Sequence, residues 1–148
     1  MKSKDEILEK LKEKEVKITP QRIAIIDYLI KNPIHPTAEN VYIAVSKKHP
    51  NISLATVYNT LEKLEAINEI IKLKMPCNNK IHFEYNLKPH SHFYCKECHK
   101  LLDIWDAPNI WPDDKRISGH QIEEANLCYK GICKDCLKNT KEKKFPEF

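Results

Sequence analysis

The sequence predicts an α+β fold in which a helical first half is followed by a second half of short strands. Apolar residues recur at helical spacing through the first half, and two strand-like segments follow them at residues 69–73 and 81–85. All six cysteines lie beyond residue 76, and six of the seven histidines are at or beyond His49. The two halves therefore differ in chemistry, and we expect each to form its own unit.

Three helices are predicted from apolar spacing and from their end signals. Thr19-Pro20 combines a capping residue with a proline at the first helical position, so the second helix begins there and ends at Asn32-Pro33. Thr37 can cap a third helix, which ends before His49-Pro50-Asn51. The residues expected to face the core in the three helices are Ile7, Leu8, Leu11, Ile23, Ile26, Leu29, Ile30, Val41 and Val45.

A fourth helix combines an apolar face with a polar one. Ser53 can cap it, and its apolar residues recur at i, i+4 and i+7 as Val57, Leu61 and Leu64. Its polar face is expected to contain Thr56, Asn59, Thr60 and Lys63, with Tyr58 at the margin. These residues offer an aromatic ring for thymine methyl groups, an amide able to pair with adenine and a lysine for phosphate. Taken alone, these residues are better explained by ordinary solvation of a surface helix.

The segments after the fourth helix complete the outline. Two strands joined by a loop over residues 75–80 follow the helices, which is the arrangement of a winged helix-turn-helix. In the second half, Pro108 and Pro112 permit at most a short or irregular helix within residues 107–117. We expect the lysine-rich tail after Lys138 to fray. The strand candidates of the second half are residues 92–94, 101–105 and 122–132.

Composition excludes several classes of protein. The 148 residues are 41% hydrophobic and 31% charged, and no apolar run approaches the roughly 18 residues of a membrane helix. The charged start, Met1 to Glu6, does not resemble a secretory signal, so we expect a cytoplasmic protein. Only two glycines are present, too few for a dinucleotide-binding fingerprint or a phosphate loop. The net charge of +4 permits nucleic-acid binding but does not establish it.

Two C-x-x-C pairs carry the strongest chemical signal. Cys95 and Cys98 form one pair, Cys133 and Cys136 form the other, and residues 99–132 separate them. Two such turns can complete a tetrahedral shell of four thiolates around Zn²⁺. A cytosolic location disfavours disulfides, and a thioredoxin-like redox site needs only one pair. The remaining cysteines, Cys77 and Cys128, have no matching partner and are interpreted as buried or free thiols.

A second metal site is suggested by His90 and His92, which share one face of a predicted strand because strand side chains alternate. Glu84 precedes them, Asp103 follows on the next strand, and His35 lies before the third helix. A mixed nitrogen and oxygen shell suits Fe(II), Mn(II) or Zn(II) better than Mg²⁺ or Ca²⁺. Paired surface histidines are the alternative interpretation. The other histidines are interpreted as structural or surface residues, and the role of His82 is left open.

Five segments carry a recognisable combination of motifs: residues 17–22 (KITPQR), 35–38 (HPTA), 51–59 (NISLATVYN), 90–98 (HSHFYCKEC) and 131–136 (GICKDC). Together they resemble the ferric uptake regulator (Fur) family of bacterial metal-dependent repressors, and most closely its peroxide-responsive PerR branch. The resemblance implies a winged-helix DNA-binding domain at residues 1–86 and a dimerisation and metal-binding domain of α/β type at residues 87–148. It also implies a homodimer that binds double-stranded DNA at a palindromic, A/T-rich operator.

The resemblance also implies a role for individual residues. The structural zinc ligands are Cys95, Cys98, Cys133 and Cys136; the regulatory Fe²⁺ or Mn²⁺ ligands are His35, Glu84, His90, His92 and Asp103; the DNA-binding residues are Lys17, Arg22, Thr56, Tyr58, Asn59 and Lys63. In the PerR branch, H₂O₂ acts on bound Fe(II), and a ligand histidine, His35 or His90 here, is oxidised. No catalytic residue and no other small-molecule substrate is expected, so the protein is not interpreted as an enzyme.

The sequence departs from the family pattern at several positions. Ser91 and Ala125 occupy positions of a further metal site found in many relatives, so we expect that site to be absent. His99 replaces a usual glycine after the first zinc pair. Glu84 and Asp103 combine one glutamate with one aspartate, whereas PerR-like members have two aspartates. A reversible sensor of iron or another divalent metal is therefore the alternative, beside a zinc hydrolase or deaminase and a zinc-containing adaptor protein.

Overall fold

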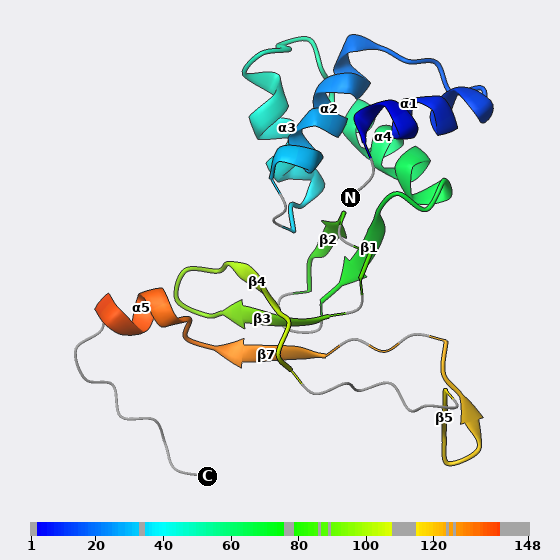
Figure 1. Ribbon diagram of the computed structural model, residues 1–148. Helices are drawn as coiled ribbons and strands as arrows, with labels where there is room; N and C mark the ends of the chain where they lie inside the picture. The colour runs from blue at the N-terminus through cyan, green and yellow to red at the C-terminus, as the bar shows by residue number, and fades with distance from the viewer. Residues whose placement is uncertain are drawn as a thin grey trace. The chain divides into compact units, whose positions relative to one another are not determined.

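A computed structural model describes residues 3–32, 35–75, 79–85, 87–88, 90–107, 115–123, 125 and 127–139 (Figure 1). The chain divides into two compact units. The first comprises Met1–Met75 and Asn79–Lys88, and the second comprises Pro76–Asn78 and Pro89–Phe148. Cys77, Pro108, Pro112 and the tail from residue 140 lie outside the described residues, so the expectations for them are not addressed by the structure.

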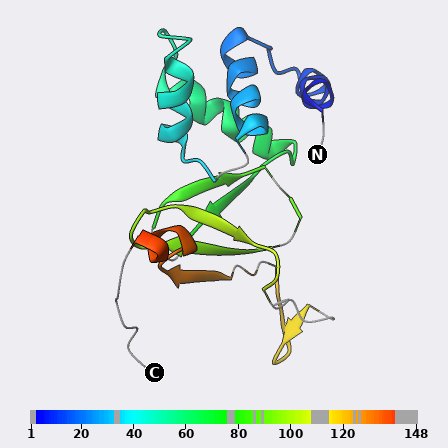
Figure 2. The same ribbon diagram turned by 60° about the vertical axis from the view of Figure 1, so that its left-hand side comes forward.

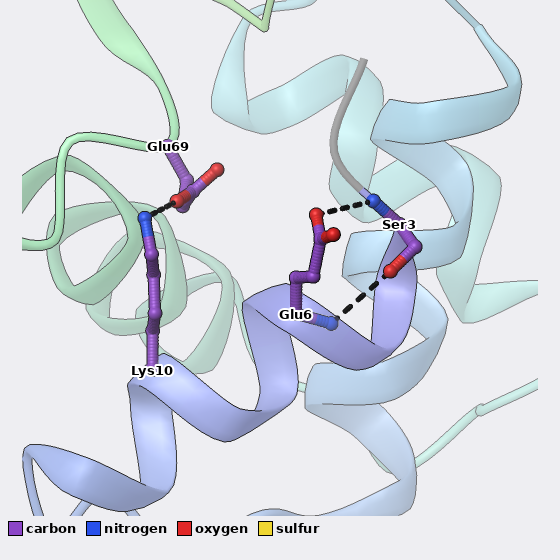
Figure 3. Close-up of polar contacts among 4 residues, drawn as sticks. All are labelled: Ser3, Glu6, Lys10 and Glu69. Atoms are coloured by element: carbon purple, nitrogen blue, oxygen red, sulfur yellow. Dashed lines mark hydrogen bonds and ion pairs between the residues drawn. The ribbon is translucent and has the colours of Figure 1, made fainter.

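The first unit consists of four helices and an antiparallel hairpin. Capping side chains begin each helix as the sequence predicts: the hydroxyls of Thr19, Thr37 and Ser53 accept hydrogen bonds from backbone N–H groups three residues later. Ser3 and Glu6 form a capping box at the first helix (Figure 3). The elements are α1 (Lys4–Glu13), α2 (Pro20–Lys31), α3 (Ala38–Ser46), α4 (Leu54–Ala66), β1 (Ile71–Lys74) and β2 (Ile81–Glu84).

The core of this unit follows most of the predicted apolar faces, with differences in α1, α2 and α4. In α1, Leu8 is only partly buried, whereas Ile7 and Leu11 are buried as predicted. Ile25 is fully buried, whereas Ile23 and Ile30 are only partly buried, so the buried face of α2 is turned relative to the prediction. The prediction that Thr60 lies on the polar face of α4 is wrong, because its side chain is 1% exposed. The Thr60 hydroxyl donates to the carbonyl of Thr56, which satisfies the buried polar group within the helix.

The predicted first strand begins two residues later than expected, at Ile71 instead of Glu69. Glu69 lies in the turn after α4, where its backbone N–H donates to the carbonyl of Leu64. Its side chain is 2% exposed, and Lys10 of α1 donates to its carboxylate across 2.5 Å (Figure 3). A buried charge requires such a partner, so this ion pair attaches α1 to the turn that leads into the hairpin.

The second unit is built on a three-stranded sheet in the order β4-β3-β7, with β3 between the other two (Figure 2). Strands β3 and β4 are antiparallel, whereas β3 and β7 are parallel. The predicted strand over residues 122–132 is too long, because β7 covers only its last part. The short helix α5 and the hairpin β5–β6 were not predicted. The elements are β3 (Ser91–Cys95), β4 (Leu101–Ile104), β5 (Arg116–Ile117), β6 (His120–Gln121), β7 (Cys128–Gly131) and α5 (Lys134–Asn139).

The predicted α+β class, with a winged helix-turn-helix first, is confirmed. Within residues 107–117, the described positions, 107 and 115–117, contain no helix. None of the helices in the described parts of the chain is long and apolar enough to cross a membrane.

Candidate metal centres and DNA interface

The four paired cysteines come together inside the second unit. Because β3 and β7 run parallel and Cys95 lies opposite Gly131, the ends of the two strands place both C-x-x-C turns side by side. One ligand atom from each of the four cysteines lies within 4.8 Å of every other. The sulfurs of Cys98 and Cys133 are 3.8 Å apart, far beyond the roughly 2.05 Å of a disulfide. A tetrahedron with Zn–S bonds of about 2.3 Å has sulfurs about 3.8 Å apart, so the cluster fits zinc.

The electrostatics of the cluster also favour a cation. Burial opposes ionisation of Cys95, but backbone N–H groups of Cys98, Cys133 and Glu97 outweigh it and lower the pKa of this thiol to about 6. Hydrogen bonding to the Cys133 sulfur, followed by burial, raises the pKa of Cys136 to about 12. Adjacent thiols therefore cannot all ionise together, because thiolates repel one another. A divalent cation removes that repulsion and lets all four bind as thiolates.

The turn after the first cysteine pair contains a residue other than glycine, His99, in a left-handed backbone conformation. The φ angle of His99 is 59°, in the left-handed region that glycine adopts without strain. Its backbone N–H donates to the carbonyl of Cys95, and its ring Nδ1 lies 3.0 Å from the hydroxyl of Tyr94. These two hydrogen bonds offset the strain of the left-handed conformation at His99.

In the first unit, His35 and Glu84 form a buried pair in which the imidazole Nε2 contacts a carboxylate oxygen. Strand β2 holds the segment that carries His35: Phe83 N–H donates to the carbonyl of Pro36, and His82 Nδ1 lies 2.6 Å from the carbonyl of His35. The role left open for His82 is therefore to hold the backbone of a predicted ligand. His35 and Glu84, the two predicted metal ligands of this unit, are thus oriented by the β1–β2 hairpin, which is the wing, and by the segment before α3.

In the second unit, His90, His92 and Asp103 lie together across β3 and β4. His92 and Asp103 are direct partners in the antiparallel register, and His90 Nε2 is 3.3 Å from an oxygen of Asp103. The two imidazole centroids are 4.6 Å apart, which confirms that they share one face. Two histidines and one carboxylate make a common donor set for Fe(II).

Trp105 is a further residue beside His90, and it was not predicted from the sequence to belong to this site. Its ring stacks on His90 with centroids 4.4 Å apart and an interplanar angle of 22°. The signal was present, because Trp105 follows Asp103 by two residues, and alternate strand residues share a face. The stacking restrains the orientation of the His90 ring.

The predicted DNA-binding residues lie on the first unit, and the structure brings some of them together. The hydroxyl of Thr56 is 2.9 Å from that of Ser53, so Thr56 takes part in the cap of α4. Tyr58 and Asn59 are exposed, as are Lys17 and Lys63. Arg22, which comes from α2, donates through Nη2 to Asn59 Oδ1 across 2.7 Å. The exposed face of α4 therefore presents an aromatic ring, an amide and a lysine, while its other face packs in the core.

A winged-helix unit followed by a unit with a four-cysteine cluster defines a class of DNA-binding, metal-containing regulators. The model of the "Ferric uptake regulator family" matches residues 13–129, and the chain belongs to that family. It is 35% identical over 136 residues to the "Peroxide operon regulator" of Bacillus subtilis, covering 90% of this chain and 92% of the relative. It is 34% identical to the "Peroxide-responsive repressor PerR" of Staphylococcus epidermidis, with 89% of each chain covered.

Two solved structures are also similar to this chain. The structure of PerR from Streptococcus pyogenes, described as a basis for peroxide sensing and gene regulation, is 31% identical with a TM-score of 0.54 and covers 92% of this chain and 94% of that one. The Helicobacter pylori ferric uptake regulator has a TM-score of 0.73 at 24% identity, with 92% of this chain and 95% of that chain covered, which supports the fold.

Proposed function

We propose that the protein is a cytoplasmic, metal-dependent transcriptional repressor that releases DNA in response to peroxide. Residues 1–86 bind double-stranded DNA through α4 and the wing, and residues 87–148 dimerise and hold metal. A homodimer presents two copies of α4 to the two halves of a palindromic, A/T-rich operator. The similarity to repressors named as peroxide-responsive supports this function.

The observation that carries the proposal is the division of the nitrogen and oxygen donors between the units. His35 and Glu84 form one oriented set, and His90, His92 and Asp103 form another. We propose that one Fe²⁺ or Mn²⁺ ion takes ligands from both sets. Such an ion favours one arrangement of the two units, and it shifts the population only by as much as it binds that arrangement better. The bound metal thereby favours the DNA-binding state.

Zinc at the four cysteines has a different role in this proposal. It connects β3 to the segment after β7 and contributes to folding, because its ligands lie within a single unit. The soft thiolates favour zinc there, whereas the mixed donors favour iron or manganese. In this proposal the cysteine site therefore stabilises the second unit, and the mixed nitrogen and oxygen site regulates DNA binding.

The peroxide response concerns the ligand histidines. Bound Fe(II) would supply the one-electron chemistry that opens the O–O bond of H₂O₂, with no net change in the oxidation state of the iron. In the net reaction one oxygen atom of H₂O₂ enters a ring C–H bond of His35 or His90, and the other leaves as water, so the imidazole provides the two electrons that reduce the peroxide. An oxidised imidazole binds metal less well, and DNA is released. Both histidines are already oriented, His35 through its contact with Glu84 and His90 by Asp103 and Trp105.

A reversible metal sensor is the second candidate, and Glu84 is the observation that favours it. The pattern of the peroxide-responsive branch has aspartate at this position. A glutamate reaches further and changes how the carboxylate approaches the metal. In such a sensor the metal dissociates without any oxidation of the protein.

Peptide mass spectrometry separates these candidates. Zinc-containing protein is loaded anaerobically with Fe(II) or, as the control, Mn(II), and is exposed to a small excess of H₂O₂. A single added oxygen on the peptide of His35 or His90, in the Fe(II) sample alone, supports the peroxide sensor. Unmodified histidines together with metal-dependent DNA binding support the reversible sensor. DNA binding that is the same with and without metal contradicts both candidates. If the protein is instead an adaptor, no metal-dependent DNA binding is expected.

A further inference from the structure

Two neighbouring side chains of α4, Tyr58 and Asn59, are each hydrogen-bonded to a side chain from another helix of the first unit. Arg22 of α2 donates to Asn59 Oδ1 across 2.7 Å, and Tyr58 donates through its hydroxyl to Glu39 Oε1 of α3 across 2.9 Å. Asn59 was expected to read DNA bases. Its orientation is therefore decided by the rest of the unit before DNA arrives.

The contact of Arg22 with Asn59 is restrained, because Arg22 makes a second hydrogen bond. Its other terminal nitrogen, Nη1, donates to the backbone carbonyl of Lys17. A guanidinium is planar and rigid, so two hydrogen bonds fix its plane. Helices α2 and α4 also share one apolar core, to which Ile26 and Leu61 belong. The position of Arg22 relative to α4 is thus set by packing.

The chemistry of arginine decides which end of the Asn59 carboxamide faces it. A guanidinium carries only donors, so the atom that it contacts must be the carboxamide oxygen. The NH₂ group is the other end of the same planar amide and points away from Arg22. The ambiguity between the oxygen and nitrogen of an asparagine side chain is thereby resolved by its partner.

We propose that Arg22 is a positioning residue for base recognition: it holds Asn59 so that the NH₂ group, and not the oxygen, meets the base edge. The inference rests on the proposed function, because it requires α4 in the major groove. Held in this way, Asn59 donates to an acceptor such as guanine O6 or N7, or thymine O4. The two-bond pairing with adenine needs the oxygen to accept from N6, so this pairing is disfavoured.

The competing role for Arg22 is a direct phosphate contact, and it predicts different measurements. A phosphate contact weakens binding to all sequences equally when it is lost, and it lowers the salt dependence of binding by about one charge. A positioning residue changes the preference at one base pair and leaves the salt dependence unchanged. Its effect also disappears when Asn59 is absent, because it acts through that side chain.

The test uses the full chain loaded with zinc and Mn(II), and a library of random-sequence DNA duplexes as the probe. Bound duplexes are sequenced to give the base preference at each position for wild type, Arg22→Lys, Asn59→Ala and the double variant. Lysine keeps the charge of Arg22 but lacks its planar fork. We expect Asn59→Ala to abolish the preference at one base pair, and Arg22→Lys to reduce it about tenfold there. In the Asn59→Ala background, Arg22→Lys should change nothing.

Asn59→Asp is a second variant that keeps a partner for Arg22. Its carboxylate only accepts, so the preference should move to a base that donates, such as cytosine or adenine. Because adenine N7 is also an acceptor, the decisive result is a preference for adenine over guanine in wild type, which would overturn the inference. An equal loss for all sequences in Arg22→Lys would also overturn it. If wild type enriches no sequence with Mn(II), the proposed function itself fails, and the inference fails with it.

Discussion

Each of the two units of this protein is stabilised in a different way. Fourteen buried apolar residues from the four helices, the segments on either side of α4 and the β1–β2 hairpin form one continuous cluster in the first unit. In the described part of the second unit, the buried apolar side chains are Cys95, Leu101 and Cys133. Two of these three belong to the cysteine cluster. The first unit is therefore stabilised mainly by apolar burial, whereas the second depends on its metal.

This contrast explains why the two kinds of metal ligand are arranged differently. A metal that stabilises a unit needs ligands from within it, as the cysteines provide. The nitrogen and oxygen donors belong to both units, and each set is oriented by strands of its own unit. We therefore expect zinc loss to unfold the second unit, and loss of the regulatory metal to leave both units folded.

Cys95→Ser should have the largest effect, because zinc-binding energy is folding energy here. We expect loss of zinc and loss of amide-exchange protection in β3 and β7, while α2 and α4 stay protected. Hydrogen exchange followed by mass spectrometry measures each unit separately. Cys128→Ser, outside the cluster, is the matched control and should retain zinc. A protected second unit without zinc would contradict the contrast between the units.

Leu61→Ala should affect the first unit instead. Leu61 is fully buried in α4, and removing such a side chain costs about 2–5 kcal/mol of unfolding free energy. Urea unfolding followed by helical circular dichroism measures this cost, and zinc content should not change. Leu54→Ala in the same helix, where the side chain is 36% exposed, should cost much less. Release of zinc by Leu61→Ala would show that the units do not unfold separately.

Lys10→Met should destabilise the first unit by about 2 kcal/mol, because it removes an ion pair made by the buried carboxylate of Glu69. The cost is lower than the roughly 3–5 kcal/mol of a fully buried pair, since the Lys10 side chain is 38% exposed. Lys4→Met removes an ion pair with Asp27 in which both side chains are over one third exposed, so it should cost under about 1 kcal/mol. Equal effects in urea unfolding would disprove the role of burial.

The regulatory metal should change the affinity for DNA and leave the folding of both units unchanged. Saturating Mn(II) should raise affinity for a duplex enriched by the wild type at least about tenfold, or 1.4 kcal/mol. His92→Ala should abolish the rise without changing zinc content, whereas His120→Ala, on exposed β6, should retain it. Fluorescence anisotropy of a labelled duplex measures both. Loss of zinc from His92→Ala would show that the two metal sites are not independent.

Much of the candidate site could be predicted because its signals are local. The spacing of Cys95 and Cys98, and of Cys133 and Cys136, predicts the four-cysteine cluster that the structure shows. The i, i+2 spacing of His90 and His92 likewise predicts that both imidazoles lie on one face. The role of His82 was left open and that of Trp105 was missed, since each depends on contacts with a backbone or a ring rather than on a motif.

The sequence alone determined the α+β class, the starts of α2, α3 and α4, and the two C-x-x-C pairs. Each depends on caps, periodicity or spacing within a few residues, where local energetics decide. Tertiary structure decided the burial of Thr60, the parallel pairing of β3 with β7, and the contact of Arg22 with Asn59. These features join residues far apart in the chain, and their free energy comes from packing that no short segment contains.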